Sequence, residues 1–274
     1  MTATGTRSRI LAVLLLVVSA IGGCTQALAE EPAQAQATLH PTLEPVSSPA
    51  VRSDPTERPT PEPSRRPERR AKPKPGAATD RPFAMNLYEE GDFVAQHTFE
   101  WCVGASVQMT WNLLRDDRRS SYRDQERLWE MARDRSVNAF GGANPFGWAQ
   151  VLTEIGLGPY EMVSIPNYRR ALRAAASALR ETGRPVGLVM WRGRHAWVMS
   201  GFESRGDPAR TDRFRVTGIR VLDPLFPHGS SLWGPSPSPN SLLTPGELAT
   251  DFVIRDRRNW SMNVTPGYLL VLPI

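Results

Sequence analysis

The spacing of apolar residues changes near Gly183, and this change constrains the fold more than any other feature of the chain. Between about residues 102 and 182, apolar residues recur every three or four positions, which is typical of amphipathic helices. From Pro185 onward, short runs rich in β-branched and aromatic residues are separated by turn residues, which indicates strands. Helices followed by strands predict an α+β fold in which N-terminal helices pack on an antiparallel sheet.

Capping residues and glycines delimit these elements. Capping boxes are predicted at Ser121–Asp124 and Thr244–Glu247, Asn167 is a further expected N-cap, and Gly156 and Gly183 are expected helix ends. After the helix that begins at Cys102, helices are expected at about 122–135, 146–155, 168–182 and 245–252. Strands are expected at 185–191, 195–203, 213–223 and 268–272, the last of them closing the sheet.

Residues 1–24 resemble a bacterial export signal. Arg7 and Arg9 precede the apolar stretch 10–21, which as a helix spans ~18 Å and is too short to cross a ~30 Å hydrocarbon core. The sequence before Cys24 resembles a lipoprotein signal, which implies a lipidated Cys24 and a membrane-anchored protein. Residues 27–29 also form an A-x-A cleavage site, and its use predicts a freely secreted protein.

Residues 25–82 form a proline-rich stretch without Phe, Trp or Tyr, which cannot bury enough apolar surface to fold. We expect a disordered tether here and a folded domain at 83–274. The net charge of +5 does not indicate nucleic-acid binding, because the basic cluster at 65–74 has no aromatic residues interleaved with it.

Cys102 is the first candidate functional residue. With Cys24 in the signal, it has no disulfide partner, and an unpaired thiol in an exported protein is a candidate reactive group. A thiol of ordinary pKa is only ~3% ionised at neutral pH, and full activation requires about 4–5 kcal/mol. A helix N-terminus supplies ~0.3–2 kcal/mol, so a neighbouring imidazolium is expected to supply the rest.

His195 begins one expected strand and Asp223 ends another. Together with Cys102 they give the order of a nucleophile, a base and an orienting acid. Gln96, six positions before Cys102, is the expected amide donor to an oxyanion. The proline-rich loop after Asp223 is expected to border the substrate cleft, with Trp233 as one wall.

These motifs, Gln96 before WCVGAS, then HAWVMSGF and VLDP, resemble the papain-like cysteine peptidases, nearest the bacterial peptidases that process bacteriocin leaders. The resemblance covers the chain from about Phe83 and implies a papain-like fold, a peptide or protein substrate and no cofactor. It assigns the oxyanion, nucleophile, base and acid roles to Gln96, Cys102, His195 and Asp223 respectively. Family members usually carry glycine directly after the cysteine, where this chain has Val103.

Two alternatives remain open. HAWV followed by DP also resembles transglutaminase-like enzymes, which implies acyl transfer to an amine. The second alternative is an inactive papain-like surface binding module, in which Val103 and Glu100 are signs that catalytic activity has been lost. So few histidines and one usable cysteine do not provide a zinc site of ordinary ligand spacing.

Overall fold

The computed structural model describes residues 80–137 and 142–274. The expected signal at 1–24, Cys24 and residues 25–79 of the expected tether lie outside the described residues. Within the two described ranges, no helix has the length and apolar character needed to cross a membrane.

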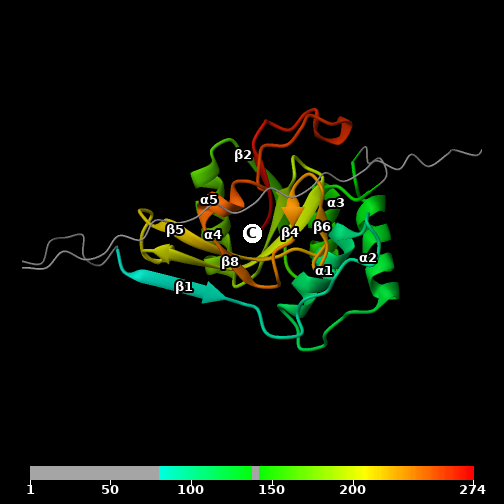
Figure 1. Ribbon diagram of the computed structural model, residues 1–274, viewed down its shortest axis with the longest axis horizontal. Helices are drawn as coiled ribbons and strands as arrows, with labels where there is room; N and C mark the ends of the chain where they lie inside the picture. Colours follow the sequence, from blue (N-terminus) through cyan, green and yellow to red (C-terminus); the bar gives the residue numbers. More distant parts are fainter. Residues whose placement is uncertain (1–79, 138–141) are drawn as a thin grey trace, which may run out of the picture. The chain divides into compact units, whose positions relative to one another are not determined.

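An antiparallel sheet, seven-stranded in the described part of the chain, forms the centre of the domain (Figure 1). Its strand order is β2 (Tyr160–Ile165), β9 (Tyr268–Pro273), β3 (Val186–Met190), β4 (His195–Arg205), β5 (Arg215–Leu222) and β8 (Ser241–Leu243). The remaining strand, β1 (Pro82–Asn86), pairs with β4, and β6 (Gly229–Ser230) and β7 (Gly234–Pro235) form a separate small ribbon.

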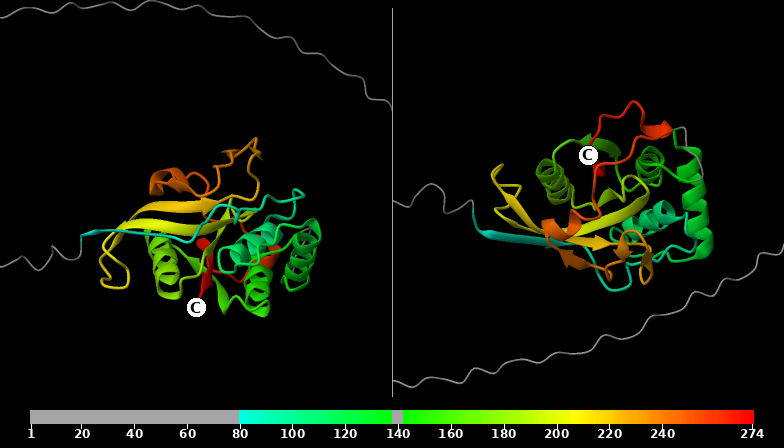
Figure 2. Two further views of the ribbon diagram at one scale, coloured as in Figure 1. Left: turned by 90° about the horizontal axis from the view of Figure 1, so that it is seen from below. Right: turned by 45° about the horizontal axis from the view of Figure 1, so that its top comes forward.

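The long strand β4 organises the sheet. One edge of β4 pairs with β3 in its first half and with β1 in its second half, while the other edge pairs with β5. Figure 2 shows β1, in cyan, running beside these yellow strands. Because Met190 of β3 lies opposite His195, the first residue of β4, the histidine is placed at the end of the sheet rather than within it.

Side chains that alternate along the strands build a core on each face of the sheet. Leu188 and Leu270 pack in the cluster that contains α4 (Tyr168–Thr182), whereas Val189 and Val271 pack in the cluster that contains the other three long helices. These are α1 (Cys102–Asn112), α2 (Tyr122–Asp134) and α3 (Pro145–Glu154). In Figure 1 they lie to the right of the central strands, and α4 lies to the left.

The α+β class is confirmed, and so are the helix signals. Ser121 and Asn167 accept hydrogen bonds from the amides of Asp124 and Arg170, and Gly183 adopts a left-handed conformation at the end of α4. These caps stabilise the first and last turns of helices whose apolar faces are buried. The expected boundaries of α2, α3 and α4 are therefore correct to within about one residue.

Three expectations are corrected. The strands β1 and β2 had not been expected, so the helices do not simply precede the strands. The strand β9 does not close the sheet, because it lies between β2 and β3 and pairs with both. Finally, α5 (Pro245–Leu248) stops early, in a turn where the Thr250 hydroxyl lies 2.7 Å from the Glu247 carbonyl and 2.8 Å from the Asp251 carboxylate and can donate its one proton to either.

Candidate active site

Cys102 is the first residue of α1, and its side chain is a half-buried free thiol. Trp101, at the N-cap, makes no side-chain capping bond, and the first turn contains no acidic residue. Glu100 is exposed, so its carboxylate is solvated. No acidic side chain in the first turn therefore offsets the positive end of the helix dipole at Cys102.

A turn with an unusual backbone sets the position of His195. Trp191, Arg192 and Gly193 have φ values of 53°, 57° and 87°, and the Gly193 amide donates to the Met190 carbonyl at 2.9 Å. Left-handed residues other than glycine cost of the order of 1 kcal/mol or more, and such strain concentrates at functional sites. The turn reverses the chain over a few residues and presents the imidazole at the sheet end nearest α1.

Asp223 follows β5 directly and is fully buried. Its Oδ1 lies 2.6 Å from Nε2 of His195 and also accepts the Leu225 amide at 2.9 Å. These two contacts fix the carboxylate and, through it, the orientation of the ring. Because Nε2 is occupied by Asp223, Nδ1 is the ring nitrogen that remains to exchange a proton with Cys102.

The electrostatics of His195 favour its charged form. Burial lowers the pKa of His195, but hydrogen bonds to Asp223 and Cys102 and the charges of both partners outweigh that effect and raise the pKa from 6.5 to about 9. The raised pKa favours the protonated ring at neutral pH, paired with the Asp223 carboxylate. Such a cation is the partner that stabilises a thiolate.

Gln96 reaches the same region by a different route. Its backbone amide donates to the Pro224 carbonyl at 2.7 Å, which ties it to the residue after Asp223. Its Nε2 donates to the carbonyls of Thr98 and Phe99, both at 3.0 Å, and its Oε1 is buried without a partner in the described residues. Both amide hydrogens are thus engaged, so service as an oxyanion donor requires the side chain to turn.

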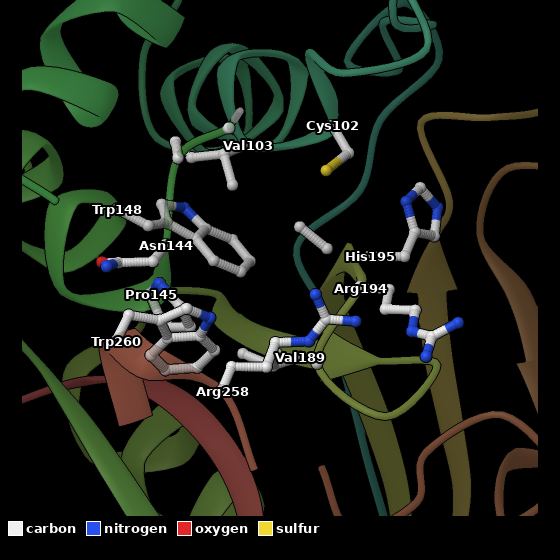
Figure 3. Close-up of a pocket in the computed structure, with 14 residues that line it drawn as sticks. Cys102, Val103, Asn144, Pro145, Trp148, Val189, Arg194, His195, Arg258 and Trp260 are labelled. Carbon is white, nitrogen blue, oxygen red and sulfur yellow. The ribbon is translucent and has the colours of Figure 1, made fainter. Parts of the chain in front are cut away.

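Two cavities meet at His195. The larger, of about 310 Å³, is lined by Cys102, Val103 and His195, and Figure 3 shows Cys102 and His195 among the side chains around it. The smaller, of about 240 Å³, is lined by Gln96 and by Trp233 of the proline-rich loop, which does not line the cavity of Cys102. Cys102, His195 and Asp223 are thus brought together, whereas Gln96 lines the smaller cavity and not the larger one that Cys102 lines.

Val103, at the position where the peptidases that these motifs resemble usually have glycine, is buried and packs in the core beneath α1. The glycine that this helix does require is Gly104. A Cβ there would lie 2.7 Å from the Gln125 carbonyl oxygen and 2.9 Å from Cβ of Trp129 in α2. The close approach of the two helices therefore depends on the second residue after Cys102, not the first.

Sequence reasoning missed several residues around the site. The Trp191 ring stacks on the His195 ring with centroids 4.1 Å apart, and its Nε1 donates to Asp251 at 2.9 Å. Arg258 and Trp260 line the larger cavity from a loop between α5 and β9. The position of Trp191 at a strand end close to His195 is a signal that could have found it, whereas the other two are distant in sequence.

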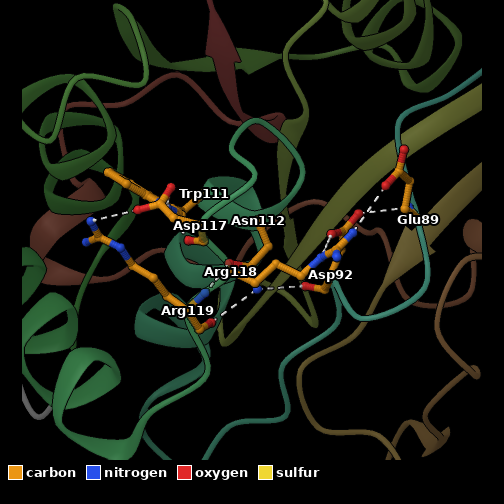
Figure 4. Close-up of polar contacts among 7 residues, drawn as sticks. All are labelled: Glu89, Asp92, Trp111, Asn112, Asp117, Arg118 and Arg119. Carbon is orange, nitrogen blue, oxygen red and sulfur yellow. Dashed lines mark hydrogen bonds and ion pairs between the residues drawn. The ribbon is translucent and has the colours of Figure 1, made fainter.

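A polar network holds the segment that leads to Gln96 against the end of α1 (Figure 4). The Asp92 side chain, almost fully buried, pairs with Nε of Arg118 at 2.8 Å and accepts the Glu89 amide at 2.7 Å. Nδ2 of Asn112, the last residue of α1, donates to the carbonyls of Asp92 and Arg119 at 3.2 and 3.1 Å. The segment is thereby anchored to the helix that carries Cys102.

In residues 80–137 and 142–274, no three side chains among His, Cys, Asp and Glu gather as a metal site requires. No protein-family model matches the chain, and no curated protein matches it.

Proposed function

We propose that this protein is a cysteine peptidase or amidase with a papain-like fold, acting on a peptide-type amide. The observation that carries the proposal is the buried 2.6 Å contact between His195 and Asp223 beside a cavity that Cys102 shares with the same histidine. The half-buried thiol at a helix N-terminus and the pKa of His195 near 9 support it. We also propose that the protein is exported and is either lipid-anchored through Cys24 or freely secreted.

In this reaction the Cys102 thiolate attacks the carbonyl carbon, and the carbonyl π electrons move to oxygen. His195 then donates its Nδ1 proton to the departing amine as the carbon–nitrogen bond breaks, which leaves a thioester. Water gives a proton to the now neutral His195 and attacks the thioester, so that the acid leaves and the thiolate–imidazolium pair is restored. Asp223 holds the ring in one orientation throughout.

The developing oxyanion requires donors. Backbone N–H groups at the start of α1 supply one, and Nε2 of Gln96 supplies a second once it turns away from the Thr98 and Phe99 carbonyls. The engaged amide of Gln96 is also the observation that favours the alternative of an inactive binding module. Transglutaminase-like acyl transfer uses the same three side chains. It differs in that an amine, rather than water, accepts the acyl group from the thioester.

The test is the rate at which iodoacetamide alkylates Cys102 in the full chain as a function of pH, followed by peptide mass spectrometry so that Cys24 is counted separately. At pH 6 a thiol of pKa ~8.5 is almost wholly protonated. A thiolate paired with His195 is expected to react roughly tenfold faster or more than a free thiol at that pH. The His195→Ala variant is expected to follow the free-thiol profile.

His228→Ala is the matched control, because His228 is exposed in the loop after Asp223 and is not part of the triad. If Cys102 follows the free-thiol profile in both the wild-type protein and His195→Ala, the inactive binding module is favoured over the enzyme. If the thiolate is present, hydroxylamine added with a peptide library separates the two enzyme reactions, since efficient hydroxamate formation indicates acyl transfer.

A further inference from the structure

The cavity beside Cys102 carries positive charge without matching negative charge. Arg194 and Arg258 both line it, and among the described residues no Asp or Glu side chain lines either this cavity or the smaller one next to it. Figure 3 shows the Arg258 guanidinium extending toward the middle of the cavity, on the side of Cys102 and His195.

The two arginines differ in what offsets their charge. Nη2 of Arg194 pairs with Asp256 at 3.1 Å, and the same carboxylate lies 3.9 Å from Arg192. Arg258 forms no ion pair and stacks on no aromatic ring in the part of the chain that the structure describes, and its Nε is buried without a partner there. One carboxylate thus serves Arg192 and Arg194, and none serves Arg258.

The loop that carries Arg258 does not need its guanidinium for stability. The buried Arg255 donates from Nη2 to the Ser261 carbonyl at 3.0 Å and to the Val264 carbonyl, which ties the loop together. Trp260 packs edge-on against Phe146 of α3, with ring centroids 6.4 Å apart. The loop is therefore held by Arg255 and Trp260, and the Arg258 side chain is available to a ligand.

An uncompensated guanidinium in a partly desolvated cavity is unfavourable until an anion pairs with it. Its planar fork matches a carboxylate, which can accept two parallel N–H bonds. We propose that Arg258, assisted by Arg194, binds a carboxylate of the substrate close to the bond that Cys102 attacks. This inference rests on the proposed function and narrows its substrates to peptides with an acidic side chain or a free carboxyl group at that position.

The test compares iodoacetate with iodoacetamide at Cys102 in the full chain. The two reagents differ in that one carries a carboxylate and the other an amide. The ratio of their rate constants therefore cancels the degree of thiol ionisation and reports recognition of the carboxylate. Relative to N-acetylcysteinamide, the ratio is expected to be raised roughly fivefold or more and to fall with added salt.

Three variants locate the effect. Arg258→Gln is expected to lose most of the increase, while Arg258→Lys keeps part of it because the charge remains but the fork is lost. Arg169→Gln is the matched control, since Arg169 is exposed on α4 and lines a separate cavity, and it is expected to leave the ratio unchanged. A ratio equal to that of the free thiol, or one unchanged in Arg258→Gln, would overturn the inference.

Peptides that protect Cys102 from iodoacetamide then identify the source of the carboxylate. The probes are acetyl-Gly-Glu-Gly-amide, acetyl-Gly-Gln-Gly with a free carboxyl end, and the neutral acetyl-Gly-Gln-Gly-amide. Protection by the first or the second beyond that of the neutral peptide supports the inference and tells a side chain from a chain end, whereas equal protection by all three counts against it.

The two proposals fail in different ways. A Cys102 with the pH profile of a free thiol but a raised iodoacetate ratio would remove the catalytic proposal and keep the carboxylate site. A Cys102 that alkylates rapidly at pH 6 but shows the iodoacetate-to-iodoacetamide ratio of a free thiol would keep the catalytic proposal and remove the carboxylate site. A thiol that neither reagent reaches at pH 9 would overturn both.

Discussion

At the scale of single residues, the site depends on the protonation of one buried histidine. The imidazole of His195 is 6% exposed, and burial alone would keep it neutral at pH 7. The 2.6 Å bond to Asp223 and the neighbouring sulfur reverse that preference and raise the pKa of His195 to about 9. A group that binds its proton more tightly in the folded than in the unfolded state couples stability to pH.

The first prediction follows from this coupling. The stabilisation due to His195 is fully present below its unfolded pKa of about 6.5 and is lost as pH rises through about 9. The thiolate proposed for Cys102 has the opposite pH dependence, so the measurement is made in Cys102→Ala. There the free energy of unfolding is expected to fall over that range, by less than the roughly 3 kcal/mol that the full shift corresponds to at 1.36 kcal/mol per pKa unit, because the contribution of the sulfur is removed. Urea denaturation at pH 6 to 9.5 measures it.

In Cys102→Ala that also carries His195→Ala this fall is expected to disappear, whereas with His228→Ala, which alters an exposed ring, it should persist. An unchanged slope in the variant that lacks both Cys102 and His195 would mean that other groups cause the pH dependence and that the pKa of His195 is not raised.

Some residues of the candidate site could be predicted from the sequence and others could not. Cys102, His195 and Asp223 could be predicted, because each stands at the end of a regular element whose period is visible in the chain. The engagement of Gln96 could not, because it depends on where two backbone carbonyls point. Arg258 was missed since the loop that brings it to the cavity has no periodic pattern.

At the scale of elements, α1 is buried around almost its whole circumference. Ser106, Gln108 and Thr110 are as inaccessible as the apolar residues of the helix, because Nε2 of Gln108 bonds to the Ser121 carbonyl and the Thr110 hydroxyl to the Ser106 carbonyl. The apolar spacing marked only one face, since satisfied polar side chains can occupy a core without leaving a hydrophobic signal. The extent to which α1 is buried is therefore visible only in the structure.

Gly104→Ala gives the second prediction. The added methyl group would meet the Gln125 carbonyl oxygen at 2.7 Å and Trp129 Cβ at 2.9 Å, so α1 and α2 must separate. A loss of about 1–3 kcal/mol in the free energy of unfolding is expected, together with slower alkylation of Cys102 two residues away. Gly246→Ala, whose nearest such atom is 3.8 Å away, is the control and should change stability little.

Chemical denaturation and the iodoacetamide rate are measured on both variants. If Gly104→Ala matched Gly246→Ala in stability, the close packing of α1 on α2 would not be what positions the cysteine.

At the scale of the whole molecule, the strand β9 joins two cores. It lies between β2 and β3, and its side chains alternate between the face of α4 and the face of α1, α2 and α3. The sequence predicted β9 as a strand but not its place in the sheet, because pairing between strands far apart in the chain leaves no local pattern. The missed β2 has the same cause, as it is ordered by its pairing with β9.

Leu270→Ala tests whether the two faces unfold as one unit. Leu270 is fully buried on the α4 face, while Cys102 lies with the helices of the other face. Removing its side chain is expected to lower the free energy of unfolding by about 2–5 kcal/mol. Since both cores share β9, the urea transitions followed by tryptophan fluorescence and by Cys102 alkylation should shift together, as in a two-state domain.

Leu242→Ala, at a partly exposed edge position, is the control and should change the free energy of unfolding from either probe by no more than about 0.5 kcal/mol. The tryptophans lie in both cores, so a Cys102 that became reactive at a different urea concentration from the fluorescence change would show instead that the region around Cys102 opens separately from the rest of the domain.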